Sequence, residues 1–164
     1  MIKFLLTYWF GILLFFGLFY WDLSPISSIL NKFQTDFTAY LTSLILPKNM
    51  IENHNIFISN NYSLVIEKAC NGIIPYLFFL SSIVAFPSSI VHKIKWMLFG
   101  YILIVAMNTF RIWIVTKLVL KEPSNFSFAH DYLGNILLIL TGLTLFVWFC
   151  KSSRSREKVA LISI

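Results

Sequence analysis

The sequence predicts an all-α integral membrane protein with four transmembrane helices, and with an extracytoplasmic amphipathic helix and a small β-hairpin between spans one and two. Of its 164 residues, 58% are hydrophobic and 18% are aromatic, which is far more apolar than an ordinary soluble domain. Charged residues also divide the chain into four apolar blocks, each long enough to cross a hydrocarbon core of roughly 30 Å at about 1.5 Å per residue. We expect one membrane domain, residues 1–164, with spans at about 4–21, 70–91, 96–118 and 131–150.

Basic residues gather in the segments that precede, separate or follow the spans on one side. Lysine and arginine in short loops hold those loops in the cytoplasm. Four spans with both termini inside reproduce this alternation, so we expect a multi-pass protein of the cell membrane with segment 22–69 outside and the tail 151–164 inside. The net charge of +6 follows from this topology, and no nucleic-acid surface is expected. The basic residues concerned are Lys3, Lys93, Lys95, Lys151, Arg154, Arg156 and Lys158.

After the first span, an amphipathic helix is predicted over about 25–45. Ser24 can cap this helix with Pro25 at its first position, and Pro47 ends it. The apolar stripe can rest on the outer leaflet of the membrane or pack against the helix bundle, and the pattern does not decide between the two. Its members recur at spacings of three and four: Ile26, Ile29, Leu30, Phe33, Phe37, Tyr40, Leu41, Leu44 and Ile45.

A small hairpin is predicted next, from two β-prone runs, 56–59 and 62–66, which flank Asn60 and Asn61. Asparagine tolerates the positive φ that two-residue turns require. The second run leads directly into Cys70. This cysteine is therefore expected where an extracytoplasmic strand gives way to a membrane helix.

Cys70 is the first candidate functional residue. The other cysteine, Cys150, is expected at the inner end of the last span, so the two cannot form a disulfide. The chain has no C-x-x-C motif, which argues against a membrane thiol oxidoreductase. An unpaired thiol on the outer face can act as a nucleophile, although the simpler alternative is an inert, buried side chain.

Arg111 is the second candidate, because it lies fifteen residues past Trp96 in the third span. That distance places it roughly 22 Å into the hydrocarbon core, in its outer half. A charge inside a span is costly and commonly serves a function, whereas the alternative is an arginine that extends to the outer headgroups. Asn108 precedes Arg111 by three residues and shares its helix face, where its amide can orient the guanidinium.

His130 is the third candidate, in the outer loop that leads into the last span, and Asp131 and Gly134 follow it. A histidine in a loop is commonly just solvated. The predicted topology, however, places Cys70, Arg111 and His130 at the outer ends of three helices, and these ends meet on one side of a bundle. His130 is the best-placed base for Cys70, since the other two histidines are expected in the inner loop and before the hairpin, at His92 and His54.

Three short motifs together resemble those of the exosortase/archaeosortase family of membrane-embedded transpeptidases, over about 56–145. They are Ala69-Cys70-Asn71-Gly72 at the start of one span, Asn108-x-x-Arg111 late in the next, and His130-x-x-x-Gly134 at the start of the last. With four predicted spans, the chain resembles the short core form rather than the larger members. The resemblance implies that Cys70, Arg111 and His130 are catalytic. It also implies supporting roles for Asn71, Gly72, Asn108, Asp131 and Gly134.

The chemistry expected of this triad is that of a cysteine transpeptidase or protease. His130 would take the proton of Cys70, the thiolate would attack a peptide carbonyl to form a thioester, and Arg111 would steady the oxyanion. The resemblance implies that the substrate is an exported protein, anchored in the lipid bilayer by a C-terminal sorting signal, which passes to an acceptor. No cofactor and no metal are expected.

Two alternative functions remain open on the sequence alone. One is a non-catalytic four-helix membrane assembly or lipid-binding protein, in which Cys70 only fills space. The other is a hydrolase that uses the same three residues with water as the acceptor.

Overall fold

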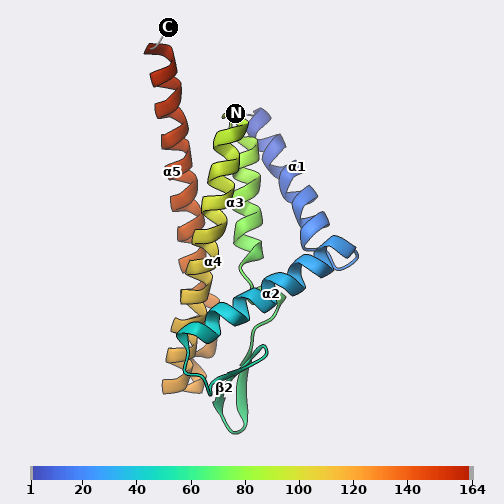
Figure 1. Ribbon diagram of the computed structural model, residues 1–164, viewed down its shortest axis with the longest axis vertical. Coiled ribbons are helices and arrows are strands. Elements are labelled where there is room, and N and C mark those ends of the chain that lie inside the picture. The colour runs from blue at the N-terminus through green and yellow to red at the C-terminus, as the bar shows by residue number, and fades with distance from the viewer. Residues whose placement is uncertain (1, 163–164) are drawn as a thin grey trace.

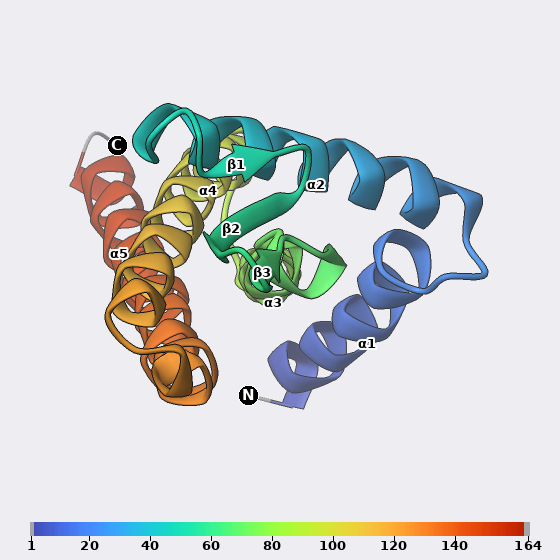
Figure 2. The same ribbon diagram turned by 90° about the horizontal axis from the view of Figure 1, so that it is seen from below.

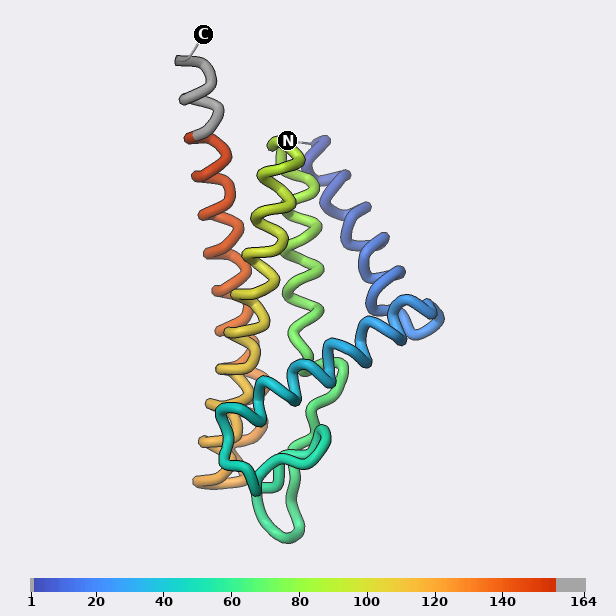
Figure 3. The backbone as a smooth tube through the Cα atoms, in the orientation of Figure 1, coloured from blue at the N-terminus to red at the C-terminus, as the bar shows by residue number. Residues whose placement is uncertain are grey.

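The structure is a computed structural model that describes residues 2–162, with side-chain surroundings for residues 2–155. Its elements are α1 (Ile2–Phe19), α2 (Pro25–Ile45), β1 (Ile51–Glu52), β2 (Asn55–Ser59), β3 (Tyr62–Val65), η1 (Lys68–Cys70), α3 (Ile73–Ala85), α4 (Ile90–Lys121), η2 (Pro123–Asn125), η3 (Phe128–Gly134) and α5 (Asn135–Ile162). Helix α3 packs against α1, α4 and α5, and α2 lies across this bundle (Figure 1). The sheet occupies one end of the molecule, and the first residues of α1 and the later part of α5 lie toward the opposite end (Figure 3).

In the described part of the chain, three helical segments are long and apolar enough to cross a membrane: Ile2–Phe19, Ile90–Lys121 and Pro123–Ser155. The span predicted at 70–91 is not one long helix. Helix α3 has 13 residues, so it extends for about 20 Å, less than the roughly 30 Å of a hydrocarbon core. The helix ends because Phe86 precedes Pro87, and the residue before a proline avoids helical backbone angles.

Helix α2 has the predicted bounds and the predicted Ser24 cap, but its buried face is polar. The Ser24 side chain accepts from the backbone N–H of Ser27, and Pro25 takes the first position. The apolar stripe points outward, with Ile29 74% and Phe33 62% exposed. The face of α2 that packs on the bundle is therefore the polar one and not the apolar stripe, and contact of the stripe with the outer leaflet stays a prediction. The polar residues on the buried face are Ser27, Asn31, Gln34, Thr38 and Thr42.

The segment between α2 and α3 forms a three-stranded antiparallel sheet in the order β1-β2-β3. Strands β2 and β3 fall on the two runs predicted to pair, and β1 was not predicted because it has only two residues. Ile56 of β2, together with Ile66 just past β3, packs on Ile112 of α4. This contact fixes the sheet against the end of α4 that carries Arg111.

The boundaries of the last two long helices differ from the predicted spans. Helix α4 begins at Ile90, so His92 lies in its first turn instead of an inner loop, where it is 2% exposed and stacks on Phe149 of α5. The last span begins as a π-helix, η3, that runs directly into α5, so His130 lies in a helix and not in a loop. Helix α5 continues into the predicted tail 151–164, whose residues 163–164 lie outside the described residues.

Candidate active site

Cys70 ends the short 3-10 helix η1, which links β3 to α3. Its backbone N–H donates to the carbonyl of Glu67 at 2.8 Å. Two residues later, Gly72 has a φ of 80°, a left-handed conformation that side chains rarely adopt. A Cβ at Gly72 would also lie 3.1 Å from the side chain of Asn108. The sequence therefore requires glycine here to turn the chain from Cys70 into α3.

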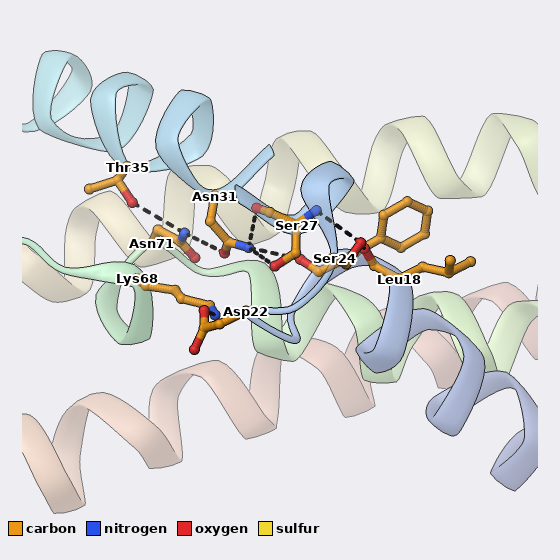
Figure 4. Close-up of polar contacts among 9 residues, drawn as sticks. Leu18, Asp22, Ser24, Ser27, Asn31, Thr35, Lys68 and Asn71 are labelled. Atoms are coloured by element: carbon orange, nitrogen blue, oxygen red, sulfur yellow. Dashed lines mark hydrogen bonds and ion pairs between the residues drawn. The ribbon is translucent and has the colours of Figure 1, made fainter. Parts of the chain in front are cut away.

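The side chain of Asn71 joins the cysteine turn to α2 and α3. Its amide donates to Asn31 Oδ1 at 3.2 Å and to Thr35 Oγ1 at 3.3 Å. Figure 4 shows Asn71 pointing toward these two residues of α2, and shows the nearby ion pair of Lys68 with Asp22. The oxygen of the Asn71 amide accepts from the backbone N–H of Ile73 at 3.0 Å, so one side chain caps α3 and binds α2.

The backbone of Asn71 is held by the same face of α2. Its carbonyl accepts from Gln34 Nε2 at 3.1 Å and from Thr38 Oγ1 at 3.4 Å. Gln34 in turn accepts at 2.6 Å from the hydroxyl of Tyr101, on α4. The polar face of α2 thus replaces solvent for the turn that carries Cys70, and Asn71 itself is fully buried.

His130 contacts Cys70 directly. Its Nε2 lies 3.4 Å from Cys70 Sγ, and its Nδ1 lies 2.9 Å from a carboxylate oxygen of Asp131. The other oxygen of Asp131 accepts from Ser127 at 2.8 Å, and the imidazole stacks on Phe126 at 5.1 Å between ring centroids. His130 and Asp131 lie in the π-helix η3, and Phe126 and Ser127 lie just before it, so this segment sets the imidazole against the sulfur.

Arg111 lies inside the protein, with 3% of its surface exposed, and does not extend to the headgroups. Its Nη1 is 3.5 Å from Asn108 Oδ1, and its Nη2 is 3.4 Å from Asn135 Oδ1. Among the described residues, no acidic side chain pairs with it, and its Nε is unpartnered. Gly134 makes room for it, since a Cβ there would lie 2.5 Å from Nε.

Asn108 connects Arg111 to the cysteine turn. Its amide nitrogen donates to the carbonyl of Cys70 at 2.8 Å, while its oxygen faces the Arg111 guanidinium. The side chain is 1% exposed. The spacing of three residues therefore places both side chains on one face of α4, and this face meets Cys70.

The surroundings of Cys70 favour its thiolate. Burial raises the pKa of the thiol, but the hydrogen bond with His130 and the charges of His130 and Arg111 outweigh burial. The resulting pKa lies below the ordinary value for cysteine.

A pocket of about 400 Å³ opens beside the sulfur. Cys70, Arg111 and His130 all line it, next to residues 62–67 of the sheet edge. Most of the remaining lining is apolar and comes from α4 and Phe126. The site can therefore receive an uncharged chain segment beside a polarised thiol.

Three residues predicted from separate parts of the chain thus line one pocket, and Asn71, Gly72, Asn108, Asp131 and Gly134 surround them. His54 pairs with Asp36 at 2.8 Å instead of reaching Cys70. Sequence reasoning missed Asn135 and the residues of α2 that hold the turn. The available signal on α2 was its second stripe, which is polar and has the same three-and-four spacing as the apolar one.

A known family model matches most of the chain. It describes the transmembrane exosortases (Exosortase_EpsH) and matches residues 2–147, a range that includes Cys70, Arg111 and His130. No curated protein and no solved structure matches the chain. The match and the three long apolar helices together indicate a multi-pass membrane protein. Because the match extends over well beyond half of the 164 residues, the chain belongs to the transmembrane exosortase family.

Proposed function

We propose that the protein is a membrane-embedded cysteine transpeptidase that cleaves the C-terminal sorting signal of exported proteins and transfers them to an acceptor. One observation carries this proposal: the Cys70 sulfur lies 3.4 Å from His130 Nε2 in a pocket that a buried, unpaired Arg111 also lines. Membership of the exosortase family supports the substrate class. We further propose that the pocket faces the extracytoplasmic side, as the basic clusters indicate.

The first half of the reaction forms an acyl-enzyme. His130 accepts the thiol proton at Nε2, and the Cys70 sulfur attacks the carbonyl carbon of the scissile bond. The tetrahedral intermediate collapses as the C–N bond breaks, and His130 donates its proton to the leaving amine. Asp131 supports this step, because a hydrogen bond from Nδ1–H to its carboxylate leaves the Nε2 lone pair directed at the sulfur.

The second half transfers the acyl group. An acceptor nucleophile gives a proton to His130 and attacks the thioester, which releases the Cys70 thiolate. In both halves, negative charge develops on the carbonyl oxygen. Arg111 can stabilise that charge because Asn108 and Asn135 fix its guanidinium while its Nε remains unpartnered.

The proposal is tested by co-expression with a protein that carries a sorting tail. We expect Cys70→Ser to abolish processing while the protein stays in the membrane, and Cys150→Ser to process at the parental rate. Mass spectrometry of the processed protein identifies the acceptor. If Cys70→Ala processed the substrate at the parental rate, the alternative of a non-catalytic membrane protein would replace this proposal. A product that ends only in a free carboxylate would indicate a hydrolase.

A further inference from the structure

Strand β3 has a free edge. It is the last strand in the order β1-β2-β3, and it pairs only with β2 in the described part of the chain. Seen from below, β1 lies beside α2 and β3 lies on the far side of the sheet, near the axis of α3 (Figure 2). A strand edge carries unpaired backbone N–H and C=O groups, which can bind another extended chain.

The register shows which groups of β3 are unpaired. Ile56 is opposite Leu64, Asn55 is opposite Val65, and the Ile66 N–H donates to His54 O at 2.8 Å. In an antiparallel pair, hydrogen-bonded and non-hydrogen-bonded positions alternate. Leu64 and Ile66 therefore bond to β2, and Val65 turns its N–H and C=O to the free edge.

The same alternation applies to Ser63, which is opposite Phe57. Its N–H and C=O also point to the free edge. No bond from another described residue reaches the backbone groups of Ser63 or Val65 on that edge. The edge thus offers two donors and two acceptors in a row.

This edge is continuous with the candidate active site. Residues 62–67 line the pocket one after another, and the same pocket contains Cys70 and His130. The chain passes from Val65 to Cys70 in five residues, with only η1 between them. An extended peptide beside β3 would therefore lead its carbonyl group to the sulfur.

We propose that β3 binds the substrate segment immediately N-terminal to the scissile bond as an added parallel strand, through the backbone groups of Ser63 and Val65. This inference rests on the proposed function, because it takes Cys70 as the nucleophile. The parallel direction follows from the membrane: the transmembrane helix of a sorting tail follows the scissile bond and must enter the bilayer beside α3. Its preceding segment then runs from the Tyr62 end of β3 toward Cys70.

The pocket also indicates which side chains suit this strand. Four residues of β3 extend for about 13 Å at about 3.3 Å per residue, so about four substrate residues pair with it. Alternate substrate side chains point toward α4, where Ile112, Val115 and Thr116 line the pocket. We therefore expect an extended segment with small or apolar side chains at alternate positions.

The test removes one backbone N–H donor from the free edge of β3 and leaves the hydrogen bonds of the sheet in place. Val65→Pro removes an N–H that β2 does not use, and proline is tolerated at such edge positions. The matched control is Ile51→Pro in β1, at the opposite edge of the sheet. Ile51 is opposite Ile56, which bonds to β3, and the Phe57 N–H bonds to Met50 O, so the Ile51 N–H also points outward.

The probe is acetyl-Val-Ala-Val-Ala chloromethyl ketone, applied to detergent-solubilised full-length protein that carries Cys150→Ser. The Cys70 thiolate displaces chloride and forms a thioether, with the peptide on the side of the N-terminal substrate segment. Iodoacetamide labels the same sulfur without a peptide. The ratio of the two labelling rates therefore reports binding along β3 and not the reactivity of the thiol.

We expect Val65→Pro to lower this ratio about tenfold, since one backbone hydrogen bond to the probe is lost, and Ile51→Pro to keep it within about twofold. A probe methylated at its amide nitrogens should label the parent more slowly than the unmethylated probe, because it cannot donate to the carbonyl groups of Ser63 and Val65. The inference would be overturned if Val65→Pro kept the parental ratio, or if the methylated and unmethylated probes labelled the parent equally fast. It would also be overturned if Ile51→Pro lowered the ratio as much as Val65→Pro. The proposed function is judged separately, by processing of a sorting tail in Cys70→Ser.

Discussion

At the scale of single residues, the imidazole of His130 is held on both sides. Asp131 accepts at Nδ1, and Cys70 lies at Nε2. This arrangement places one proton between Nδ1 and the carboxylate and a second between Nε2 and the sulfur. The buried charge of Arg111 acts on the same sulfur from the side of α4.

The pH dependence of alkylation tests this electrostatic arrangement. Because His130 and Arg111 hold the pKa of Cys70 below its ordinary value, the thiolate forms at a lower pH than in a free thiol. In Cys150→Ser protein, the rate of alkylation should therefore reach its plateau at a lower pH than it does for a free thiol. His130→Gln should shift the profile to higher pH. Superimposable profiles would show that His130 does not act on the sulfur.

Arg111 should affect the rate of reaction more than substrate binding. Arg111→Gln removes the charge that we propose stabilises the oxyanion, and it should lower kcat about a hundredfold. Arg111→Lys keeps the charge but loses the planar set of donors, so part of the activity should survive. Steady-state kinetics with a sorting-tail substrate measure both. If either variant raised KM alone, Arg111 would be a binding residue and not an oxyanion donor.

At the scale of secondary structure, the site depends on where α4 and η3 meet. A Cβ at Gly134 would lie 2.5 Å from Arg111 Nε, whereas a Cβ at Gly142 would meet nothing within 4 Å. Gly134 therefore allows the guanidinium to lie between the two elements. Alanine at Gly134 and alanine at Gly142 change the helix propensity of the same helical segment alike. A difference between the two variants therefore reports the steric role of Gly134.

Gly134→Ala should move the Arg111 side chain and lower kcat about tenfold, because a small displacement of a charge-stabilising group is costly. Gly142→Ala should retain the parental rate. Both variants should remain in the membrane and label with iodoacetamide at Cys70. Equal activity of the two variants would mean that Arg111 tolerates the displacement.

The elements also show what sequence reasoning can reach. The helix at 25–45 was predictable from its cap, its prolines and its periodicity. The meeting of Cys70, Arg111 and His130 in one pocket was predictable from charge and placement, and their catalytic roles stay a prediction. The end of α3 at Ala85 was missed because the block 70–91 is apolar throughout, although Pro87 marks the break. The π-helix was missed because its bonding pattern depends on packing and leaves no periodic signal.

At the scale of the whole molecule, the two faces of α2 are arranged opposite to those of a helix in a soluble protein, where the apolar face is buried and the polar face is exposed. Its apolar side chains face outward and its polar ones bind the cysteine turn. Large apolar side chains are likewise exposed on α1, α4 and α5, as expected for surfaces in lipid. The sheet lies at one end of this apolar body (Figure 1), and its edge residues 62–67 line the pocket of the site.

The orientation of this body is tested with single cysteines in a Cys70→Ser, Cys150→Ser background. A membrane-impermeant thiol reagent should label exposed Ser59→Cys and Ser124→Cys in intact cells. It should reach Ser89→Cys and Ser155→Cys only after permeabilisation, because the basic clusters predict that these segments are cytoplasmic. The reverse pattern would place the site in the cytoplasm.

The proposed mechanism makes Cys70 the nucleophile, and the most direct measurement of this role is the mass of the enzyme during turnover. With a sorting-tail substrate and no added acceptor, Cys70 should carry the N-terminal product as a thioester that hydroxylamine releases. This adduct should be present in Cys150→Ser and absent in Cys70→Ser. Processing that continues in Cys70→Ser, with no adduct on Cys70 in the parent, would contradict the mechanism.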